Sequence, residues 1–281
     1  MSYKSILVHA DGAEAAQNRY RLAALIAQAH RAHLTGIATS GLTPFFLRYA
    51  AATAMAPLAA EDFSFLTDNA KDNLAIFERG VRQAGVQAPT ITLSEQEAWQ
   101  ELPLAARYCD LLVIGRNHAS DSLIGDSQSL ARSLLVHAPC PVLVVPDAAP
   151  AVTAPSRILI AWDGGMEASR ALRAALPLLR HAAGVAAATF NPAIALTATD
   201  AAATPLAALS RYLGHHGIAV DALPQADSVN VGRSLLASAE RHGIDLIVMG
   251  SYTHSRVREV VLGGVTRTML AESDIALLMS H

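Results

Sequence analysis

The fold is decided by a stretch that occurs twice, as KSILVHADGAEAAQNRYRLAALIAQAHRAHLTGIA (residues 4–38) and as SRILIAWDGGMEASRALRAALPLLRHAAGVAAATF (residues 156–190). Each copy contains a short apolar run, an Asp-Gly pair, a helical pattern and a second apolar run. Asp11 and Asp163 hold the same place, 152 positions apart. A further match, YCDLLVIG against GIDLIVMG, follows at an offset of 135. The chain therefore contains an internal repeat.

Short apolar runs alternate with amphipathic helical patterns in both halves. We expect strands near 5–9, 34–39, 89–93, 111–114 and 142–146, and near 157–162, 184–190, 218–223, 245–249 and 275–279. The runs are continuously apolar, which indicates that both faces of the sheet are covered. The sequence thus predicts an α/β fold with two tandem, doubly wound, Rossmann-like domains, each with five parallel strands.

The repeat also sets the domain boundaries. We expect domains at 1–147 and 157–281, joined by the Pro- and Ala-rich linker PDAAPAVTAPS (residues 146–156). Because the offset falls from 152 to 135, the first half carries about 17 extra residues, mostly within 40–65. This apolar insertion either packs against a sheet or forms a lid over the first site.

Composition narrows the class of protein. The net charge is −3 and only 16% of residues are charged, which gives no sign of a nucleic-acid or anionic-membrane partner. No apolar run reaches the roughly 18 residues of a membrane helix, and the start carries no signal-peptide pattern. We therefore expect a cytoplasmic protein. Cys109 and Cys140 lie in apolar runs without metal-ligand spacing, so we interpret them as small buried hydrophobic residues.

Ligands of such sheets bind beyond the carboxyl ends of the strands, where the strand order switches. Asp163 and Gly250 follow the first and fourth strands of the second half, and Asp11 and Gly115 take the same places in the first. An aspartate at this position accepts hydrogen bonds from a ribose hydroxyl or an adenine amino group. An aspartate also caps helix beginnings. The sequence leaves both roles open.

A glycine pair precedes the last helical pattern of the second half. Glycines at Gly263 and Gly264 would let the backbone N–H groups of Gly264, Val265 and Thr266 approach phosphate oxygens, and Thr266 offers a hydroxyl. Alternatively, Gly263 only ends the preceding helix in a left-handed cap. Three arginines nearby would offset phosphate charge: Arg256, Arg258 and Arg267.

The I-L-(V/I)-x-x-D-G openings, the D-L-(I/L)-V-x-G strands and the HAPCPVLVVP ending (residues 137–146) resemble the universal stress protein family in its tandem form. The resemblance covers both halves. It implies a parallel sheet of the adenine nucleotide alpha hydrolase-like type in each domain, and a cytoplasmic role in stress survival. In some members it also implies ATP binding.

ATP-binding members carry Gly, two residues, Gly, nine residues, then Gly followed by Ser, Thr or Asn. Gly250 and Gly263 match the first and third glycines, whereas Thr253 replaces the second and Gly264 replaces the hydroxyl residue. Thr266 matches a further small hydroxyl residue of the family. The resemblance therefore implies a degenerate adenine-nucleotide site in the second half, formed by Asp163, Gly250, Arg256, Gly263, Gly264, Val265 and Thr266.

The first half departs further from this pattern. His118 and Gln128 replace two of the glycines, which leaves Gly115 and Ser129. Each carboxylate in the segment would repel a triphosphate by about 1 kcal/mol or more. We expect no ATP in the family's pose in this half. The two carboxylates concerned are Asp121 and Asp126.

Three functions remain. The first is a binding module with a nucleotide in the second half, and the second is a scaffold that acts through dimerisation and partner proteins. The third is an enzyme that hydrolyses or transfers adenylate. We expect that the protein is not an enzyme, because no general base, metal pair or nucleophile is grouped at the carboxyl ends of the strands. We expect no metal either, since GHHG (residues 214–217) lacks other ligands at suitable spacing.

The closing strands PVLVVP (residues 141–146) and IALLMS (residues 275–280) would be aggregation-prone edges if left bare. We expect the two halves to pair through them, or through nearby surfaces, as an internal pseudo-dimer. The resemblance implies that the same surfaces form homodimers in the family.

Overall fold

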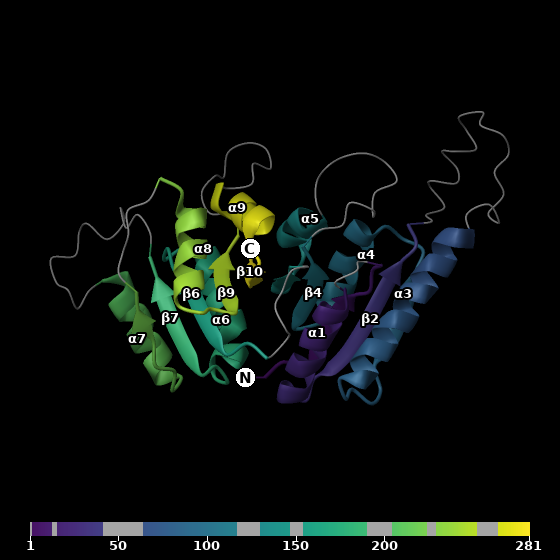
Figure 1. Cartoon of the computed structure of the whole chain (residues 1–281), viewed down its shortest axis with the longest axis horizontal. Helices are drawn as coiled ribbons and strands as arrows, with labels where there is room; N and C mark the ends of the chain where they lie inside the picture. Colours follow the sequence, from purple (N-terminus) through teal and green to yellow (C-terminus); the bar gives the residue numbers. More distant parts are fainter. Residues whose placement is uncertain are drawn as a thin grey trace. The chain divides into compact units, whose positions relative to one another are not determined.

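The computed structural model is drawn in Figure 1. It describes residues 2–12, 16–41, 64–116, 130–146, 154–189, 204–223, 229–251 and 264–281. The chain forms two compact units, one built mainly from Ser2–Cys140 and the other from Pro141–Ala149 and Thr153–His281. The closing strand of the first repeat thus belongs to the second unit.

The first unit contains parallel strands in the order β3-β2-β1-β4. The strands are β1 (Ser5–His9), β2 (His33–Thr39), β3 (Thr90–Ser94) and β4 (Leu111–Gly115). The helices are α1 (Ala16–His30), α3 (Ser64–Gln83), α4 (Ala98–Ala105), the 3-10 helix η2 (Ala106–Tyr108) and α5 (Leu130–His137). Each strand lies within one residue of its predicted position.

The second unit has strands in the order β5-β10-β9-β6-β7-β8. The strands are β5 (Val142–Val145), β6 (Arg157–Ala161), β7 (Gly184–Ala188), β8 (Asp221–Ala222), β9 (Leu246–Gly250) and β10 (Ala276–Ser280). The helices are α6 (Met166–Leu179), α7 (Pro205–His215), α8 (Val231–Arg241) and α9 (Gly264–Glu272). β8 is shorter than predicted, and the α/β prediction is confirmed.

The two closing strands form an antiparallel pair. Val144 lies opposite Leu277, and Val142 lies opposite Met279, whereas β10 runs parallel to β9. The sheet is therefore mixed rather than wholly parallel. This ladder pairs the backbone N–H and C=O groups of two apolar strands that would otherwise be exposed sheet edges.

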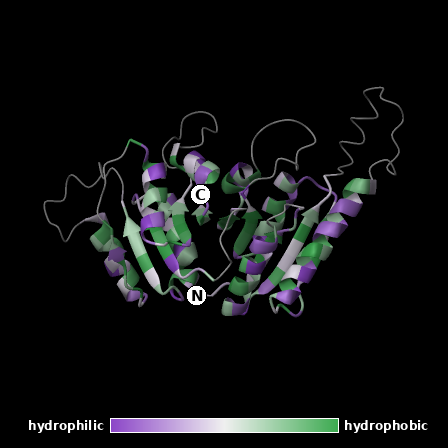
Figure 2. Ribbon diagram, in the orientation of Figure 1, coloured by the Kyte–Doolittle hydropathy of each residue, from purple (hydrophilic) through white to green (hydrophobic). Residues whose placement is uncertain are grey.

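Most strands are buried, as continuous apolar runs predict, whereas β3 and β8, the last strands in the order of their units, are exposed. Every residue of β4 and of β5 is buried. Figure 2 shows strands coloured mainly as hydrophobic and helices with mixed faces. The rings of Tyr20 in α1 and Phe77 in α3 meet edge to face at 5.2 Å. A Cβ at Gly36 in β2 would lie 2.2 Å from Phe77, so this glycine leaves room for the ring.

The helices are amphipathic. In α8, Gly232, Leu235 and Ala239 are buried at helical spacing, and Asn230 caps the start by accepting a hydrogen bond from the N–H of Arg233 at 3.1 Å. Among the helices in the described ranges, none combines the length and apolarity required to cross a bilayer.

One carboxylate in each repeat ties two strands together. Asp110, just before β4, accepts hydrogen bonds from the N–H groups of Lys4 and Ser5 at 2.6 and 3.0 Å. Asp245, just before β9, accepts them from Ser156 and Arg157 at 2.8 and 3.0 Å. The aspartate of the D-L-(I/L)-V pattern is thus structural in both repeats. It fixes the register at which the first strand of the repeat enters the sheet.

Candidate functional site

The switch in strand order falls at the first strand of each repeat. In the second unit β6 lies between β7, which follows it in the chain, and β9, which returns on the other side. In the first unit β1 lies between β2 and β4 in the same way. A crevice beyond the carboxyl ends of such strands is where doubly wound sheets bind ligands. Asp163 and Asp11 follow these two strands.

Asp163 is exposed and only partly engaged. Its Oδ1 accepts a hydrogen bond from the N–H of Gly165 at 2.8 Å, and Gly164 between them has a φ of +77°. The side chain thus closes a local turn. Gly165 itself holds the N-cap position of α6, with no side-chain cap. Within the described ranges no hydrogen bond to Oδ2 is formed.

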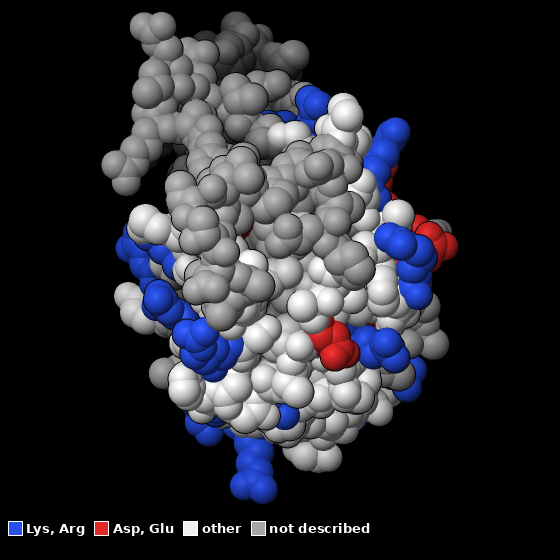
Figure 3. All heavy atoms as spheres, turned by 90° about the vertical axis from the view of Figure 1, so that its left-hand side faces the viewer, with Lys and Arg blue, Asp and Glu red and all other residues white. Residues whose placement is uncertain are grey.

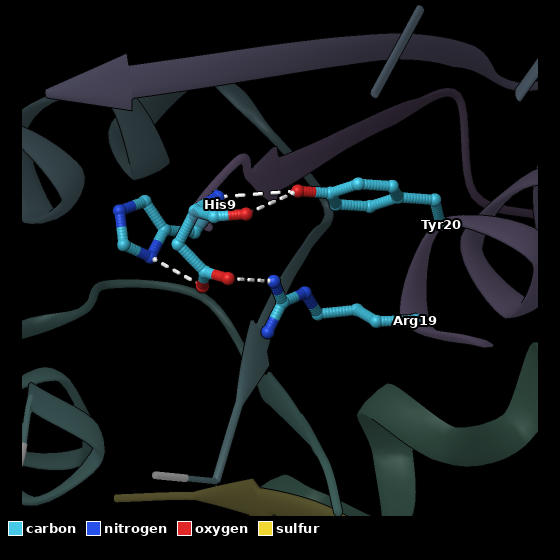
Figure 4. A network of polar contacts seen from close by, with 4 residues as sticks. His9, Arg19 and Tyr20 are labelled. Carbon is cyan, nitrogen blue, oxygen red and sulfur yellow. Dashed lines mark hydrogen bonds and ion pairs between the residues drawn. The ribbon is translucent and has the colours of Figure 1, made fainter. Parts of the chain in front are cut away.

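Asp11 has the opposite environment, shown in Figure 4. Its carboxylate is 4% exposed and forms an ion pair with the guanidinium of Arg19, which is 2% exposed. His9 Nδ1 lies 3.4 Å from its Oδ2. This carboxylate is held inside the first unit, where it compensates a buried cation.

The backbone of Asp11 is held as well. The hydroxyl of Tyr20 accepts a hydrogen bond from the N–H of Asp11 at 3.1 Å and donates one to its carbonyl oxygen at 2.9 Å. Burial raises the pKa of Tyr20 to about 12, which keeps the phenol protonated and able to donate at neutral pH.

The second repeat lacks this network. At the offset of 152, Ala161, Ala171 and Leu172 replace His9, Arg19 and Tyr20. The burial of the helices confirms the register, because Arg19 and Tyr20 lie on the buried face of α1 and their counterparts lie on the buried face of α6. Sequence reasoning missed the network. An arginine at a position where the other repeat has a buried alanine is the signal that would have revealed it.

Gly250 has a packing role at the end of β9. A Cβ there would lie 2.6 Å from the backbone nitrogen of Ala168 and 2.8 Å from the carbonyl carbon of Glu167. The first turn of α6 therefore packs directly on this strand end. The glycine brings the start of α6 close to the switch point, and its presence is explained whether or not a nucleotide binds.

Two buried hydroxyls lie at the same edge and were missed by sequence reasoning. Ser251 follows β9 and is 0% exposed, and Thr189 follows β7 and is 5% exposed. In the part of the chain that the structure describes, neither hydroxyl has a hydrogen-bond partner. Buried polar groups are rarely left so. Both hydroxyls keep hydrogen-bonding capacity beside the switch point.

The start of α9 is only partly described. Gly264 is the first residue of the helix, is exposed, and has no neighbouring atom within 4 Å of the place a Cβ would take. Val265 is half-buried and Thr266 is 4% exposed. The first N–H groups of a helix have no partner within the helix.

Several predicted site residues lie outside the described residues. In the second repeat these are Thr253, Arg256, Arg258 and Gly263. In the first repeat they are His118, Asp121, Asp126, Gln128 and Ser129. Most of the insertion at 40–65 and most of the linker at 146–156 also lie outside them.

Figure 3 shows one side of the second unit. Among the described residues of this view, the basic side chains form separate groups rather than one patch.

The fold is a tandem pair of doubly wound α/β domains. Each has a switch in strand order at its first strand, β1 or β6. The sequence profile of the universal stress protein family matches residues 2–146 and 155–281. The chain therefore belongs to the universal stress protein family.

Solved structures show the same fold. A universal stress protein from Archaeoglobus fulgidus DSM 4304 matches with a TM-score of 0.73 and 16% identity, over 98% of this chain and 97% of that chain. A functionally unknown protein from Pseudomonas aeruginosa PAO1 matches with a TM-score of 0.56 and 16% identity, over 99% of this chain and 92% of that chain. A search of curated protein sequences finds no match.

Shorter relatives match one half of the chain. A universal stress protein solved in complex with cAMP is 18% identical over 52% of this chain and 99% of that chain, with a TM-score of 0.38. A universal stress protein from Archaeoglobus fulgidus solved in complex with dAMP is 19% identical over 51% of this chain and 98% of that chain, with a TM-score of 0.36.

Proposed function

We propose that this tandem universal stress protein is a cytoplasmic binding module whose second repeat holds an adenine nucleotide, while its first repeat holds none in the family's pose. One observation carries the proposal. Asp163 is exposed and has an oxygen without a partner in the described residues, whereas Asp11 is buried against Arg19. The same position therefore offers an acceptor in one repeat and a closed ion pair in the other.

Each part of the second edge has a role in this proposal. Asp163 Oδ2 accepts a hydrogen bond from a ribose hydroxyl or an adenine amino group. The backbone N–H groups of Gly264, Val265 and Thr266 bind phosphate oxygens at the start of α9, where the helix dipole favours an anion. Arg256 offsets phosphate charge. The buried hydroxyls of Ser251 and Thr189 support the proposal, because they leave polar capacity at the same edge.

We further propose binding without turnover. Asp163 already accepts the N–H of Gly165, so it is suited to hold a ligand in a fixed orientation. The rival function is a scaffold that binds no nucleotide. It is favoured by Gly250, whose packing against α6 explains that glycine without a ligand.

Equilibrium binding of ATP to Asp163→Asn and wild type tests the proposal. The asparagine keeps an oxygen that accepts the Gly165 N–H but replaces the second acceptor by an amide donor. We expect wild type to bind ATP, the variant to lose about tenfold or more in affinity, and neither to release phosphate. No ATP binding by wild type at millimolar concentration would favour the scaffold, and phosphate release above background would establish an enzyme.

The charge reversal Arg256→Glu with Arg258→Glu tests the phosphate end separately. We expect most ATP affinity to be lost, while the stability without ligand changes by less than about 0.5 kcal/mol. ATP binding that survives the reversal would show that these arginines do not contact the phosphates.

A further inference from the structure

The two cysteines of the chain meet in the first unit. Cys109 lies between η2 and β4, and Cys140 lies just before Pro141 and β5. Their Sγ atoms are 3.6 Å apart and share a hydrogen bond, although 31 positions separate them in the sequence. Both side chains are half-buried rather than fully enclosed, and both are free thiols. The interpretation of both residues as buried hydrophobic residues missed this contact.

We propose that Cys109 and Cys140 form a reversible intramolecular disulfide when the protein meets a peroxide. Cys109 attacks one oxygen of the peroxide as a thiolate, the O–O bond breaks, and Cys109 becomes a sulfenic acid while the other oxygen leaves as water or an alcohol. Cys140 then attacks the sulfenyl sulfur, the S–S bond forms as the S–O bond breaks, and the hydroxyl leaves as water with the proton of Cys140. Two thiols are oxidised and one peroxide is reduced.

The pKa values of the two thiols shift in opposite directions, which favours different roles for them. The hydrogen bond with Cys140 lowers the pKa of Cys109, although burial opposes this effect, so Cys109 has the greater thiolate character. The same hydrogen bond, together with burial, raises the pKa of Cys140. The thiolate is the nucleophile in such chemistry. Cys109 is therefore the sulfur that reacts first, and Cys140 resolves the sulfenic acid.

The second repeat shows that the fold does not require thiols here. At the offset of 135, Cys109 corresponds to Ile244 and Cys140 to Ile275. Ile244 is 8% exposed, so an apolar side chain fills the equivalent position. The first repeat thus has two reactive groups where packing alone accepts two isoleucines.

The bond would form with little movement and would constrain a defined segment. A disulfide has an S–S length of about 2 Å, so side-chain rotation can close the 3.6 Å separation. The link would enclose β4 and α5 and fix the point where the chain leaves the first unit, since Cys140 is the last residue of Ser2–Cys140. A crosslink across a loop of this length restricts the unfolded chain and stabilises the fold.

Peptide mapping of the full chain tests the proposal without any variant. Reduced protein is treated with excess hydrogen peroxide, the remaining thiols are alkylated, and the digest is analysed by mass spectrometry. We expect a Cys109–Cys140 crosslinked peptide in most molecules, its loss on addition of dithiothreitol, and a melting temperature raised by about 5 °C or more in the oxidised form. Two alkylated thiols after treatment, a disulfide between chains, or a sulfinic acid without a disulfide would overturn the proposal.

Three variants sharpen the assignment of roles. Cys140→Ser should accumulate a sulfenic acid at Cys109 that dimedone traps, and Cys109→Ser should react with peroxide about tenfold more slowly at Cys140. The matched control Cys109→Ile with Cys140→Ile places the residues of the second repeat in the first, and its melting temperature should not respond to peroxide. Faster oxidation of Cys140 than of Cys109 would reverse the roles and contradict the assignment.

Discussion

Asp11 and Asp163 hold the same position in the two repeats and have different surroundings. Asp11 is buried against Arg19, His9 and Tyr20, whereas Asp163 is exposed and bonded to one backbone N–H. Three substitutions account for the difference, because alanine or leucine stands at the equivalent positions of the second repeat. An aspartate shared by two repeats of one fold can therefore serve stability in one and remain available to a ligand in the other.

The largest expected effect comes from breaking the buried ion pair of the first repeat. Arg19→Ala, which introduces the residue found at Ala171, leaves the Asp11 carboxylate buried without its cation. We expect a loss of about 3–5 kcal/mol in the free energy of unfolding, measured by urea denaturation.

Arg21→Ala is the matched control, because Arg21 lies on the exposed side of the same helix. It should change the free energy of unfolding by less than about 0.5 kcal/mol. If Arg19→Ala loses less than about 1 kcal/mol, Asp11 is not held as the structure indicates.

The next largest effect on stability is expected at the aspartate that precedes the fourth strand in both repeats. Asp110→Ala and Asp245→Ala each remove a carboxylate that accepts two backbone N–H groups. We expect each variant to lose about 1–3 kcal/mol in urea denaturation, with similar values for the two. A large loss for one and none for the other would show that the repeats do not use this aspartate in the same way.

Gly250→Ala should destabilise through packing. Its Cβ would lie 2.6 Å from the backbone nitrogen of Ala168, so α6 must shift. We expect a loss of about 1–3 kcal/mol, measured by thermal denaturation without ligand. Gly264→Ala is the control, since no atom lies within 4 Å of its Cβ position. Equal stability of Gly250→Ala and wild type would remove the packing explanation.

The smallest effect on stability is expected at Asp163. Asp163→Asn keeps the acceptor for the Gly165 N–H and lies on the surface. Its free energy of unfolding without ligand should match that of wild type within about 0.5 kcal/mol. A loss comparable to that of Arg19→Ala would mean that Asp163 is as structural as Asp11.

The fold was predictable because the information is local and periodic. Continuous apolar runs located the strands, and the repeat indicated that the same fold occurs twice in tandem. Pairing through the closing strands was expected from their apolar edges, whereas its antiparallel direction was not predicted. β8 was overestimated because the apolar residues around Ile218 lie in loop before the two-residue strand Asp221–Ala222.

The site was less predictable because its features depend on contacts between distant residues. Arg19 looks like a solvated helix residue until its position is compared with Ala171. The contact between Cys109 and Cys140 joins residues 31 positions apart. The hydroxyls of Ser251 and Thr189 are notable only once hydrogen bonds are counted. Arg256 and Gly263 remain sequence predictions.

Crystallography of the full chain with millimolar ATP tests the central claim most directly, because it locates the ligand in one repeat or the other. We predict nucleotide density against Asp163 and the start of α9, with none at the edge beside Asp11. Nucleotide density beside Asp11 and Gly115, or no nucleotide density in either repeat, would contradict the account.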